Sequence, residues 1–361
     1  MDAIALLSAQ YFQQVDPPLL SLPDGPALVS PTIQSAIYER MFNENTAWPL
    51  PPAPYQTRVL KTIIARIEES ISDPEEDEVL DNLMEKWTLL LSTPKPSALE
   101  QAQQLTYIKY STPTMSSLLD ADAETHPEQC ESFNTKTIVT SENRSLILSA
   151  GTTGFRTWEA ALHLGTFLST TDPGRSLIAN KRVLELGAGT GFLSFLCAKH
   201  LGAENVTVTD REPALIEQIS DCIGKNGLDS KKIQAGIWEW GMPLQISPFS
   251  EEGGEGARKR FDIAIGADLI YDTDIVPLLV STIKDLFNNY SIKEFIIAAT
   301  VRNEDTFNTF LDVCGKSCSH PLSVISLVNR RLRLLVKYHT PAFSFFSPLL
   351  SCRHLIPIAI L

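Results

Sequence analysis

The chain has 361 residues and a formal net charge of −13, with a composition that is ordinary for a globular protein. This length is sufficient for a catalytic domain of about two hundred residues and a second unit. The charge is concentrated in residues 1–150, where 21 Asp and Glu stand against 9 Lys and Arg, and this argues against phosphate-backbone binding as the main activity. An acidic first half suits a basic protein partner, although a solvated acidic surface also explains it.

The N-terminal part of the chain is predicted to be helical. Apolar residues recur at helical spacing within 55–71 and again within 79–90, and proline-rich segments at 51–54 and 94–96 punctuate these stretches. We therefore expect an N-terminal helical domain over residues 1–134. Such a domain either recognises the substrate or covers the catalytic core.

A different pattern begins after residue 135. Residues 137–140 and 146–148 are predicted to form two paired strands, and strands then alternate with helices from residue 155 onward. This alternation is typical of a parallel sheet that helices cover on both faces. The expected strands are 182–186, 205–209, 232–237, 261–266 and 293–300, and the expected helices are 157–168, 192–201, 213–225, 273–289 and 304–314.

Residues 182–191, with the sequence RVLELGAGTG, are the most informative segment. Val183, Leu184 and Leu186 predict a buried strand that runs into glycines at positions 187, 189 and 191. Glycine allows positive φ and lets a ligand approach the main chain. In a doubly wound sheet, the first strand–helix turn is where an adenosine-bearing cofactor binds.

Two acids indicate which cofactor this turn holds. A dinucleotide site requires a third glycine where this chain has Phe192, so NAD and FAD fit poorly. Glu185 at the strand end is unfavourable for a phosphate and favourable for a cation, and Asp210 at the end of the next strand suits ribose hydroxyls. S-adenosylmethionine carries a positive sulfonium and no phosphate, so we expect it here. A tight turn without a ligand is the alternative. The turn residues are Gly187, Ala188, Gly189 and Gly191.

The run 261–271 predicts a second part of the site. It contains the fourth strand, and Asp268 follows its carboxyl end, the edge at which ligands bind in open α/β sheets. Asp268 and Tyr271 are three residues apart and are expected to project over the methyl group of the cofactor. The alternative is that Asp268 caps the following helix and that Tyr271 is simply packed.

Two tryptophans are further candidates. Trp158 falls within the helix predicted at 157–168, and Trp240 follows the third strand. The flat apolar ring of Trp240 is expected to pack against the adenine base. A place in the core is the alternative for either residue.

Several segments resemble a known family. Residues 149–162 (SAGTTGFRTWEAAL) resemble the entry segment of the seven-β-strand protein-lysine methyltransferases, and residues 267–271 (ADLIY) look like that family's Asp-x-x-Tyr signature. Within the family, residues 151–154 and 299–303 resemble the branch that methylates elongation factor 2 on lysine, and the helical first part is similar to that branch as well. The resemblance covers residues 1–315.

The resemblance implies an α/β fold with a class I, Rossmann-like methyltransferase sheet and an N-terminal helical domain. It implies a catalytic domain over residues 135–340 that binds S-adenosylmethionine, with Asp268 and Tyr271 as the signature pair. Residues 341–361 are unlike the family, so we expect a divergent tail there. The family's cofactor residues fall on Trp158, Gly187, Ala188, Gly189, Asp210, Trp240 and Ala267.

The expected function is S-adenosylmethionine-dependent methylation of a protein lysine, with elongation factor 2 as the substrate. Residues 268–271 read Asp-Leu-Ile-Tyr, whereas an amino-methylating enzyme for nucleic acid would be expected to carry an Asn/Asp-Pro-Pro-aromatic run. A methyltransferase for a different protein or for a small molecule, and a non-catalytic methyltransferase-like binding module, are the alternatives.

The remaining expectations concern location and partners. The chain has no basic, apolar leader and no apolar run of membrane length, and its six cysteines include no Cys-x-x-Cys pair. We therefore expect a cytoplasmic monomer that binds no metal, no membrane and no nucleic acid directly.

Overall fold

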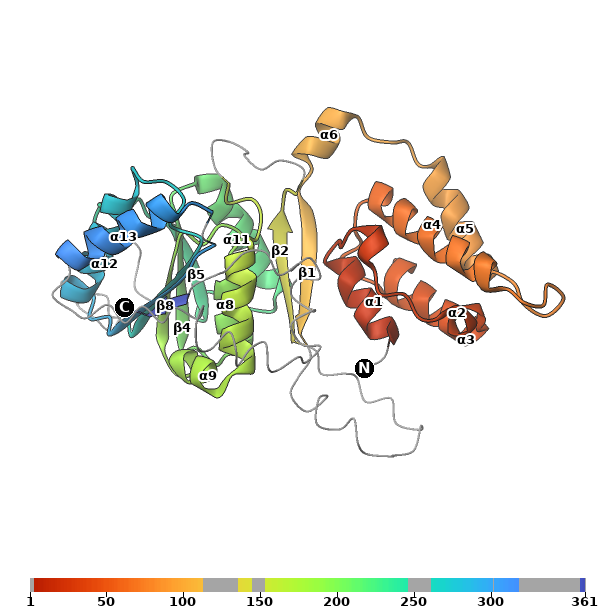
Figure 1. The fold of residues 1–361 in the computed structure, drawn as a ribbon, viewed down its shortest axis with the longest axis horizontal. Helices are drawn as coiled ribbons and strands as arrows, with labels where there is room; N and C mark the ends of the chain where they lie inside the picture. The colour runs from red at the N-terminus through yellow and green to blue at the C-terminus, as the bar shows by residue number, and fades with distance from the viewer. Residues whose placement is uncertain are drawn as a thin grey trace. The chain divides into compact units, whose positions relative to one another are not determined.

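The computed structural model describes residues 3–112, 136–144, 153–245, 261–300, 302–317 and 358–360. The chain divides into two compact units after residue 146, which we call unit 1 and unit 2 (Figure 1). The domain boundary was predicted after residue 134, which placed residues 136–142 in the catalytic domain. In the structure these residues belong to unit 1. Within the described ranges, no helix is both long enough and apolar enough to cross a membrane.

Unit 1 contains the predicted helices. Its core is formed by the apolar faces of the helices, with Tyr11, Phe42 and Leu60 fully buried among them. The two long helices, α4 and α5, confirm the helical spacing in the sequence, since Val59, Ile63 and the other apolar residues of α4 point into this core. The helices are α1 (Ala3–Phe12), η1 (Pro17–Leu19), α2 (Gly25–Val29), α3 (Pro31–Ile37), η2 (Tyr38–Phe42), α4 (Ala53–Ser70), α5 (Asp81–Ser92) and α6 (Ala98–Gln103).

A strand pair completes unit 1. β1 (Thr106–Thr112) pairs antiparallel with β2 (Lys136–Glu142), so the expectation of a helical domain over residues 1–134 is wrong for residues 106–112, which form a strand. The partner predicted for β2, at 146–148, lies outside the described residues. The buried Glu142 carboxylate accepts hydrogen bonds from Tyr110 Oη at 2.7 Å and from Arg144 Nε at 3.1 Å. This ionic network ties the two strands together at one end.

Unit 2 contains the predicted α/β sheet. Within the described residues the strand order is β5-β4-β3-β6-β7-β8; the first five strands are parallel, and β8 runs antiparallel to β7. The α/β fold expected from the sequence is therefore confirmed, and β8 comes from the segment expected to be a divergent tail. The strands are β3 (Arg182–Leu186), β4 (Asn205–Asp210), β5 (Ile233–Ile237), β6 (Ile263–Ala267), β7 (Glu294–Ala298) and β8 (Ile358–Ile360).

Helices cover both faces of this sheet, as predicted. Leu184 and Leu186 of β3 share a hydrophobic cluster with Leu279 and Phe310 of α12 and α13. Glu185, between them, points to the other face because side chains alternate along a strand, and there it meets Ser194 of α10. The helices are α8 (Glu159–Thr170), α9 (Asp172–Ile178), α10 (Phe192–His200), α11 (Pro213–Lys225), α12 (Val276–Asn289) and α13 (Glu304–Ser317).

Candidate functional site

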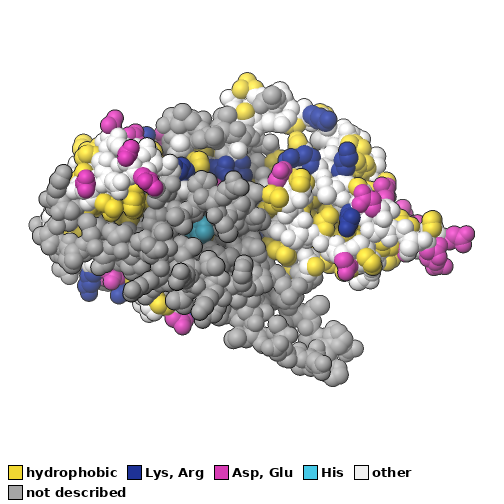
Figure 2. Space-filling view, in the orientation of Figure 1, with side chains coloured by type: hydrophobic (Ala, Val, Ile, Leu, Met, Phe, Trp, Pro, Cys, Tyr) yellow, Lys and Arg dark blue, Asp and Glu magenta, His cyan; other side chains and the backbone are white. Residues whose placement is uncertain are grey.

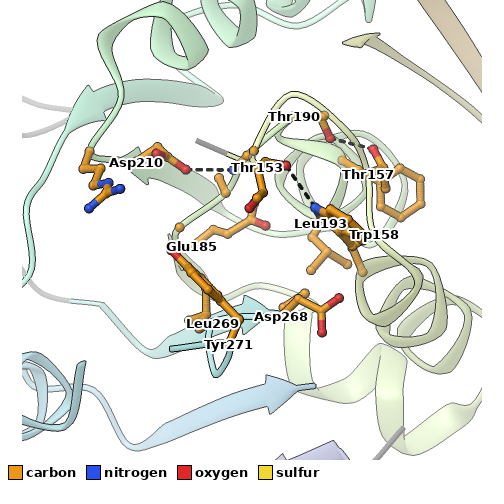
Figure 3. Close-up of a pocket in the computed structure, with 18 of the residues that line it drawn as sticks. Thr153, Thr157, Trp158, Glu185, Thr190, Leu193, Asp210, Asp268, Leu269 and Tyr271 are labelled. Carbon is orange, nitrogen blue, oxygen red and sulfur yellow. Dashed lines mark hydrogen bonds between the residues drawn. The ribbon is translucent and has the colours of Figure 1, made fainter. Parts of the chain in front are cut away.

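The carboxyl ends of the parallel strands meet at one edge of the sheet and enclose a pocket of about 280 Å³ (Figure 3). Such an edge position is where open α/β sheets bind their ligands. Ten of the eleven residues predicted from the sequence line this pocket, and Gly191 is the one that does not. They are Trp158, Glu185, Gly187, Ala188, Gly189, Asp210, Trp240, Ala267, Asp268 and Tyr271.

The glycine turn between β3 and α10 has the conformation that its sequence predicts. Gly187, Gly189 and Gly191 have φ values of +57°, +55° and +75°, which favour glycine. A Cβ at Gly187 would lie 2.7 Å from Leu269 Cδ2, and one at Gly189 would lie 3.0 Å from the carbonyl oxygen of Gly154. The turn is therefore bare backbone at the pocket wall, while Gly191 serves as the residue before α10.

Glu185 lies beneath this turn and is 3% exposed. Its carboxylate accepts hydrogen bonds from the backbone N–H of Ser194, at 2.9 Å, and from the Ser194 hydroxyl. Burial raises the pKa of Glu185 to about 8, and the hydrogen bonds from Ser194 oppose this increase. The group is thus close to its titration point at neutral pH, and a cation in the pocket would favour its ionised form.

Asp210, at the end of β4, holds the glycine turn from the other side. Its carboxylate accepts hydrogen bonds from the backbone N–H of Gly189 at 2.9 Å and of Glu212 at 3.1 Å. Burial raises the pKa of this carboxyl group, and these backbone donors counteract the increase. Each carboxylate oxygen can accept a further hydrogen bond, so Asp210 can hold the turn and receive two hydroxyl groups of a ligand.

The two predicted tryptophans lie in the pocket wall. Trp240 is partly buried, and its Cζ2 lies 3.4 Å from the position that a Cβ on Gly187 would take. Trp158 directly precedes α8 instead of lying within it, and its Nε1–H donates to the carbonyl oxygen of Thr153 at 3.0 Å. Both rings therefore offer flat apolar surface to a ligand, and Trp238, which also lines the pocket, is more deeply buried at 3% exposed.

Asp268 follows β6 in a left-handed conformation, with φ of +54°. Its Oδ1 accepts a hydrogen bond from the backbone N–H of Thr300 at 2.7 Å, and its side chain is only 8% exposed. Burial raises the pKa of Asp268, while Thr300 and Arg302 oppose the increase. The alternative role as a helix cap does not fit, because α12 begins at Val276 with Ile275 before it.

Tyr271 lines the pocket and is 53% exposed, so it is not packed in the core. Figure 3 shows its ring at the side of the pocket that also carries Leu269 and Asp268. The structure thus brings the predicted pair Asp268 and Tyr271 to one pocket with the glycine turn. A half-exposed aromatic ring at this position can contact a ligand that enters from solvent.

A cluster of charged residues that were not among the predicted site residues lies at the pocket, formed by Arg156, Glu159 and Arg302. Arg302 Nη2 lies 3.3 Å from Asp268 Oδ2 and 3.5 Å from Glu159 Oε2, and the Arg302 guanidinium lies 4.9 Å from the centre of the Trp158 ring. Arg156 Nη2 lies 3.8 Å from Glu159 Oε1, and its guanidinium lies 5.3 Å from the same ring. These residues lie within the segments 149–162 and 299–303, which resemble the family. Their positions in the sequence gave no sign that the two segments contact each other.

These residues fit S-adenosylmethionine better than a phosphate-bearing cofactor. The carboxyl groups of Glu185 and Asp210 lie beside the glycine turn, where they disfavour a phosphate, and Trp240 adds an aromatic ring to the same lining. The described residues contain no group of three His, Cys, Asp or Glu side chains placed to hold a metal ion. Carboxyl groups and aromatic rings of this kind suit an organic ligand that carries hydroxyl groups and a positive charge.

Comparisons with known proteins found a matching family model, relatives and solved structures. A family model described as lysine methyltransferase matches residues 145–316. A protein-lysine N-methyltransferase of Chaetomium thermophilum named EFM3 is 43% identical over 298 residues, which cover 82% of this chain and 83% of that protein. The human protein-lysine N-methyltransferase EEF2KMT is 27% identical over 194 residues, or 50% of this chain and 55% of that protein. A SAM-dependent methyltransferase from Aquifex aeolicus has a solved structure with 13% identity and a TM-score of 0.36, over 55% of this chain and 92% of its own.

Proposed function

We propose that this chain, which belongs to the lysine methyltransferase family, methylates a lysine of elongation factor 2. It is a protein-lysine N-methyltransferase, and S-adenosylmethionine is its methyl donor. The substrate is the part of this statement that is proposed. We also propose, from the sequence, that the protein is a cytoplasmic monomer and that residues 1–134 recognise the substrate while residues 135–340 carry the chemistry.

The choice of elongation factor 2 as the substrate rests on the similarity of this chain to methyltransferases, one of which is named after that factor. The name of the human relative, EEF2KMT, refers to EEF2. The match to the Chaetomium protein extends well beyond residues 145–316, so it is not limited to the catalytic range. Residues 151–154 and 299–303 also resemble the branch that acts on elongation factor 2.

Unit 1 supports a large protein as the substrate. The connection between α4 and α5 carries Glu75, Glu76 and Glu78, all exposed, and Figure 2 shows acidic side chains gathered at this tip. A methyl-transfer site reads one lysine and its neighbours, so selection of one folded protein requires further contact surface. An acidic surface accelerates encounter with basic patches on such a partner.

The proposed roles of the site residues follow from their places in the pocket. Glu185, Asp210, Trp158, Trp240 and the glycine turn would hold the cofactor, which supplies an electrophilic methyl group when bound. Asp268 would orient the substrate amine, because its carboxylate is fixed by Thr300 and still faces the pocket. Positioning of two bound reactants can be worth several orders of magnitude in rate.

The lysine must arrive as a neutral amine. Free lysine has a pKa of about 10.4, and only the deprotonated nitrogen has a lone pair for attack. Desolvation in a channel disfavours the charged ammonium, and so does a nearby positive charge. Tyr271, at the pocket, would wall this channel and face the methylated cation through its ring.

The alternatives make different demands on the molecule. A non-catalytic binding module would have no use for a cofactor pocket in which Glu185 and Asp268 are both desolvated. A methyltransferase for a small molecule would have no use for the acidic surface of unit 1. A methyltransferase for a different protein would keep every feature of the site, so it is the main competitor.

Labelling in cell extract separates these functions. The purified protein would be incubated with tritiated S-adenosylmethionine and an extract from cells that lack its gene, and the labelled product would be identified by mass spectrometry. We expect one main labelled band, elongation factor 2, with the label on lysine. A different labelled protein would overturn the substrate, and label only in small molecules would overturn the protein as substrate class.

A further inference from the structure

The guanidinium of Arg302 lies at the meeting point of three segments. It contacts Asp268 Oδ2 at 3.3 Å from the loop after β7, and it contacts Glu159 Oε2 at 3.5 Å at the start of α8. The Trp158 ring, whose centre lies 4.9 Å away, contacts the same guanidinium as a cation–π partner. Arg302 also lines the pocket itself, and its side chain is 44% exposed.

The proposed role of Asp268 contains a conflict that this arrangement resolves. A carboxylate that holds the substrate amine also stabilises its protonated form, since an opposite charge within about 4–6 Å favours the ion by about one to three pKa units. The ammonium form has no lone pair and cannot attack a methyl group. An unopposed Asp268 would therefore bind the substrate in an unreactive state.

We propose that Arg302 is a positioning residue that shares the Asp268 carboxylate with the substrate amine, so that Asp268 orients the amine without retaining its proton. The proposal rests on the proposed role of Asp268 in orienting the amine. Asp268 Oδ1 accepts a hydrogen bond from the backbone N–H of Thr300 at 2.7 Å. Oδ2 accepts from Arg302 Nη2 and from the Thr300 hydroxyl, both at 3.3 Å, and it is the oxygen that the amine would share with Arg302.

Glu159 and Trp158 provide a second contact for Arg302 when the amine approaches. Glu159 lies between two guanidinium groups, with Arg156 at 3.8 Å and Arg302 at 3.5 Å, and the Trp158 ring contacts both. Arg302 can move away from Asp268 Oδ2 and remain paired with Glu159. Its positive charge then stays near the amine and continues to favour the neutral form.

The other charged groups of the pocket come from different elements. The end of β3 supplies Glu185, the end of β4 supplies Asp210 and the adjacent Arg211, and the segment after β5 supplies Glu239. The segment after β6 supplies Asp268 and Tyr271. Among the described residues, Arg302 is the only basic group that forms an ion pair with Asp268. A change of charge at residue 302 therefore acts on Asp268 directly. The acidic residues near the glycine turn are the same in the variant and in the native protein, so they do not contribute to a difference between the two.

The test is the pH dependence of turnover. The substrate is the protein that the native enzyme labels in extract of cells that lack the gene, purified and used at saturating concentration, so the profile reports the enzyme–substrate complex. Native protein, Arg302→Gln and Arg302→Lys would be compared from pH 6.5 to 10. Arg175→Gln is the matched control, because Arg175 forms an ion pair with Asp172 on α9 and does not line the pocket. Cofactor affinity would be measured for each protein by calorimetry.

Without the charge at residue 302, the limb along which kcat rises with pH as the amine loses its proton should move to higher pH by about one unit, since Arg302 is partly exposed. At pH 7.5 kcat should fall about tenfold, while KM stays the same or decreases and cofactor affinity is unchanged. Arg302→Lys should retain the native profile. Glu159→Gln should shift the profile in the opposite direction and raise KM, because Arg302 then pairs more tightly with Asp268.

Several results would overturn the proposal. A loss of kcat that is equal at every pH would indicate a merely structural role, and an Arg302→Lys variant that behaves like Arg302→Gln would exclude charge as the cause. If Asp268→Ala keeps native turnover, the role of Asp268 fails and this inference fails with it. If Asp268→Ala loses turnover but Arg302→Gln shows no basic shift, only this inference fails. If Arg302→Gln does not fold, the kcat profile of Glu159→Gln decides: a shift to lower pH supports the proposal, and no shift or a shift to higher pH overturns it.

Discussion

Asp268 Oδ1 accepts a hydrogen bond from the backbone N–H of Thr300 at 2.7 Å, and this contact joins the segments that follow β6 and β7. The backbone N–H of Asp268 donates in return to the carbonyl oxygen of Ala298 at 2.8 Å. The carboxylate is thus held by main chain on one side and remains in contact with the pocket on the other. A side chain fixed in this way can orient a substrate without reorganisation during the reaction.

The first prediction is that Asp268→Ala reduces kcat by about a hundredfold or more, because the oriented acceptor for the amine is lost. Cofactor affinity should change little, since the glycine turn and Asp210 are untouched. Asp274→Ala, an exposed residue of the same loop, is the control and should keep native turnover. An equal loss of cofactor affinity and turnover in Asp268→Ala would instead assign Asp268 to cofactor binding or to folding.

The second prediction separates backbone strain from blockage of the pocket. Gly189→Arg should abolish S-adenosylmethionine binding, because the new side chain starts at the pocket wall, 3.0 Å from the Gly154 carbonyl oxygen. Gly202 also has positive φ, at +70°, but a Cβ there meets nothing within 4 Å. Gly202→Arg therefore carries a similar left-handed cost of about 1 kcal/mol without entering the pocket. Calorimetry that finds native affinity in a folded Gly189→Arg protein would rule out this cofactor site.

The third prediction concerns stability and pH through Glu185. Burial raises its pKa in the folded protein to about 8, above about 4.3 for an unfolded glutamate. The folded state therefore retains a proton that the unfolded state has lost, so this group's contribution to stability is fully present below about pH 4.3 and is lost as the pH rises through about 8. Glu185→Gln keeps an acceptor for Ser194 and should lose less thermal stability between pH 6 and 9 than the native protein. Parallel melting curves of the two proteins over this range would contradict the assignment.

The same residue gives a fourth prediction about ligand charge. At pH 8.5 and above Glu185 is largely ionised, so it should favour the sulfonium of S-adenosylmethionine over the neutral sulfur of S-adenosylhomocysteine. Glu185→Gln should weaken binding of the first ligand several-fold more than binding of the second. Calorimetric titration with both ligands measures the difference directly, and equal losses for the two would mean that Glu185 acts only through Ser194 and the turn.

Much of unit 2 could be predicted because its signals are local. Val183, Leu184 and Leu186 followed by alternate glycines predicted β3 with the bounds that the structure has, since a buried parallel strand is nearly continuous in apolar residues. The carboxyl ends of parallel strands meet at one edge, so Asp210 and Asp268 were expected to share a pocket.

The features that could not be predicted depend on contacts between distant segments. β1 pairs with β2 across a long connection, whereas the sequence favoured a partner close to β2 along the chain. Arg302, Glu159 and Asp268 come from three separate segments, and a charged residue after a strand carries no local sign of its partner. Glu142 and Tyr110 are likewise buried together in unit 1, with the partly buried Arg144 beside them, and the spacing of these residues in the sequence carried no signal of the contact.

Methylation of purified elongation factor 2 tests most directly whether the protein acts on a lysine of this substrate. Purified elongation factor 2 from cells that lack the gene would be incubated with S-adenosylmethionine and native protein, with Asp268→Ala, or with Glu75→Gln/Glu76→Gln/Glu78→Gln, and the products would be mapped by peptide mass spectrometry. We predict methylation of one lysine by the native protein, a loss of about a hundredfold or more with Asp268→Ala, and a raised KM with weaker salt dependence but native kcat for the triple variant. Unmodified elongation factor 2, under conditions in which the same preparation methylates another protein in extract, would contradict the claim.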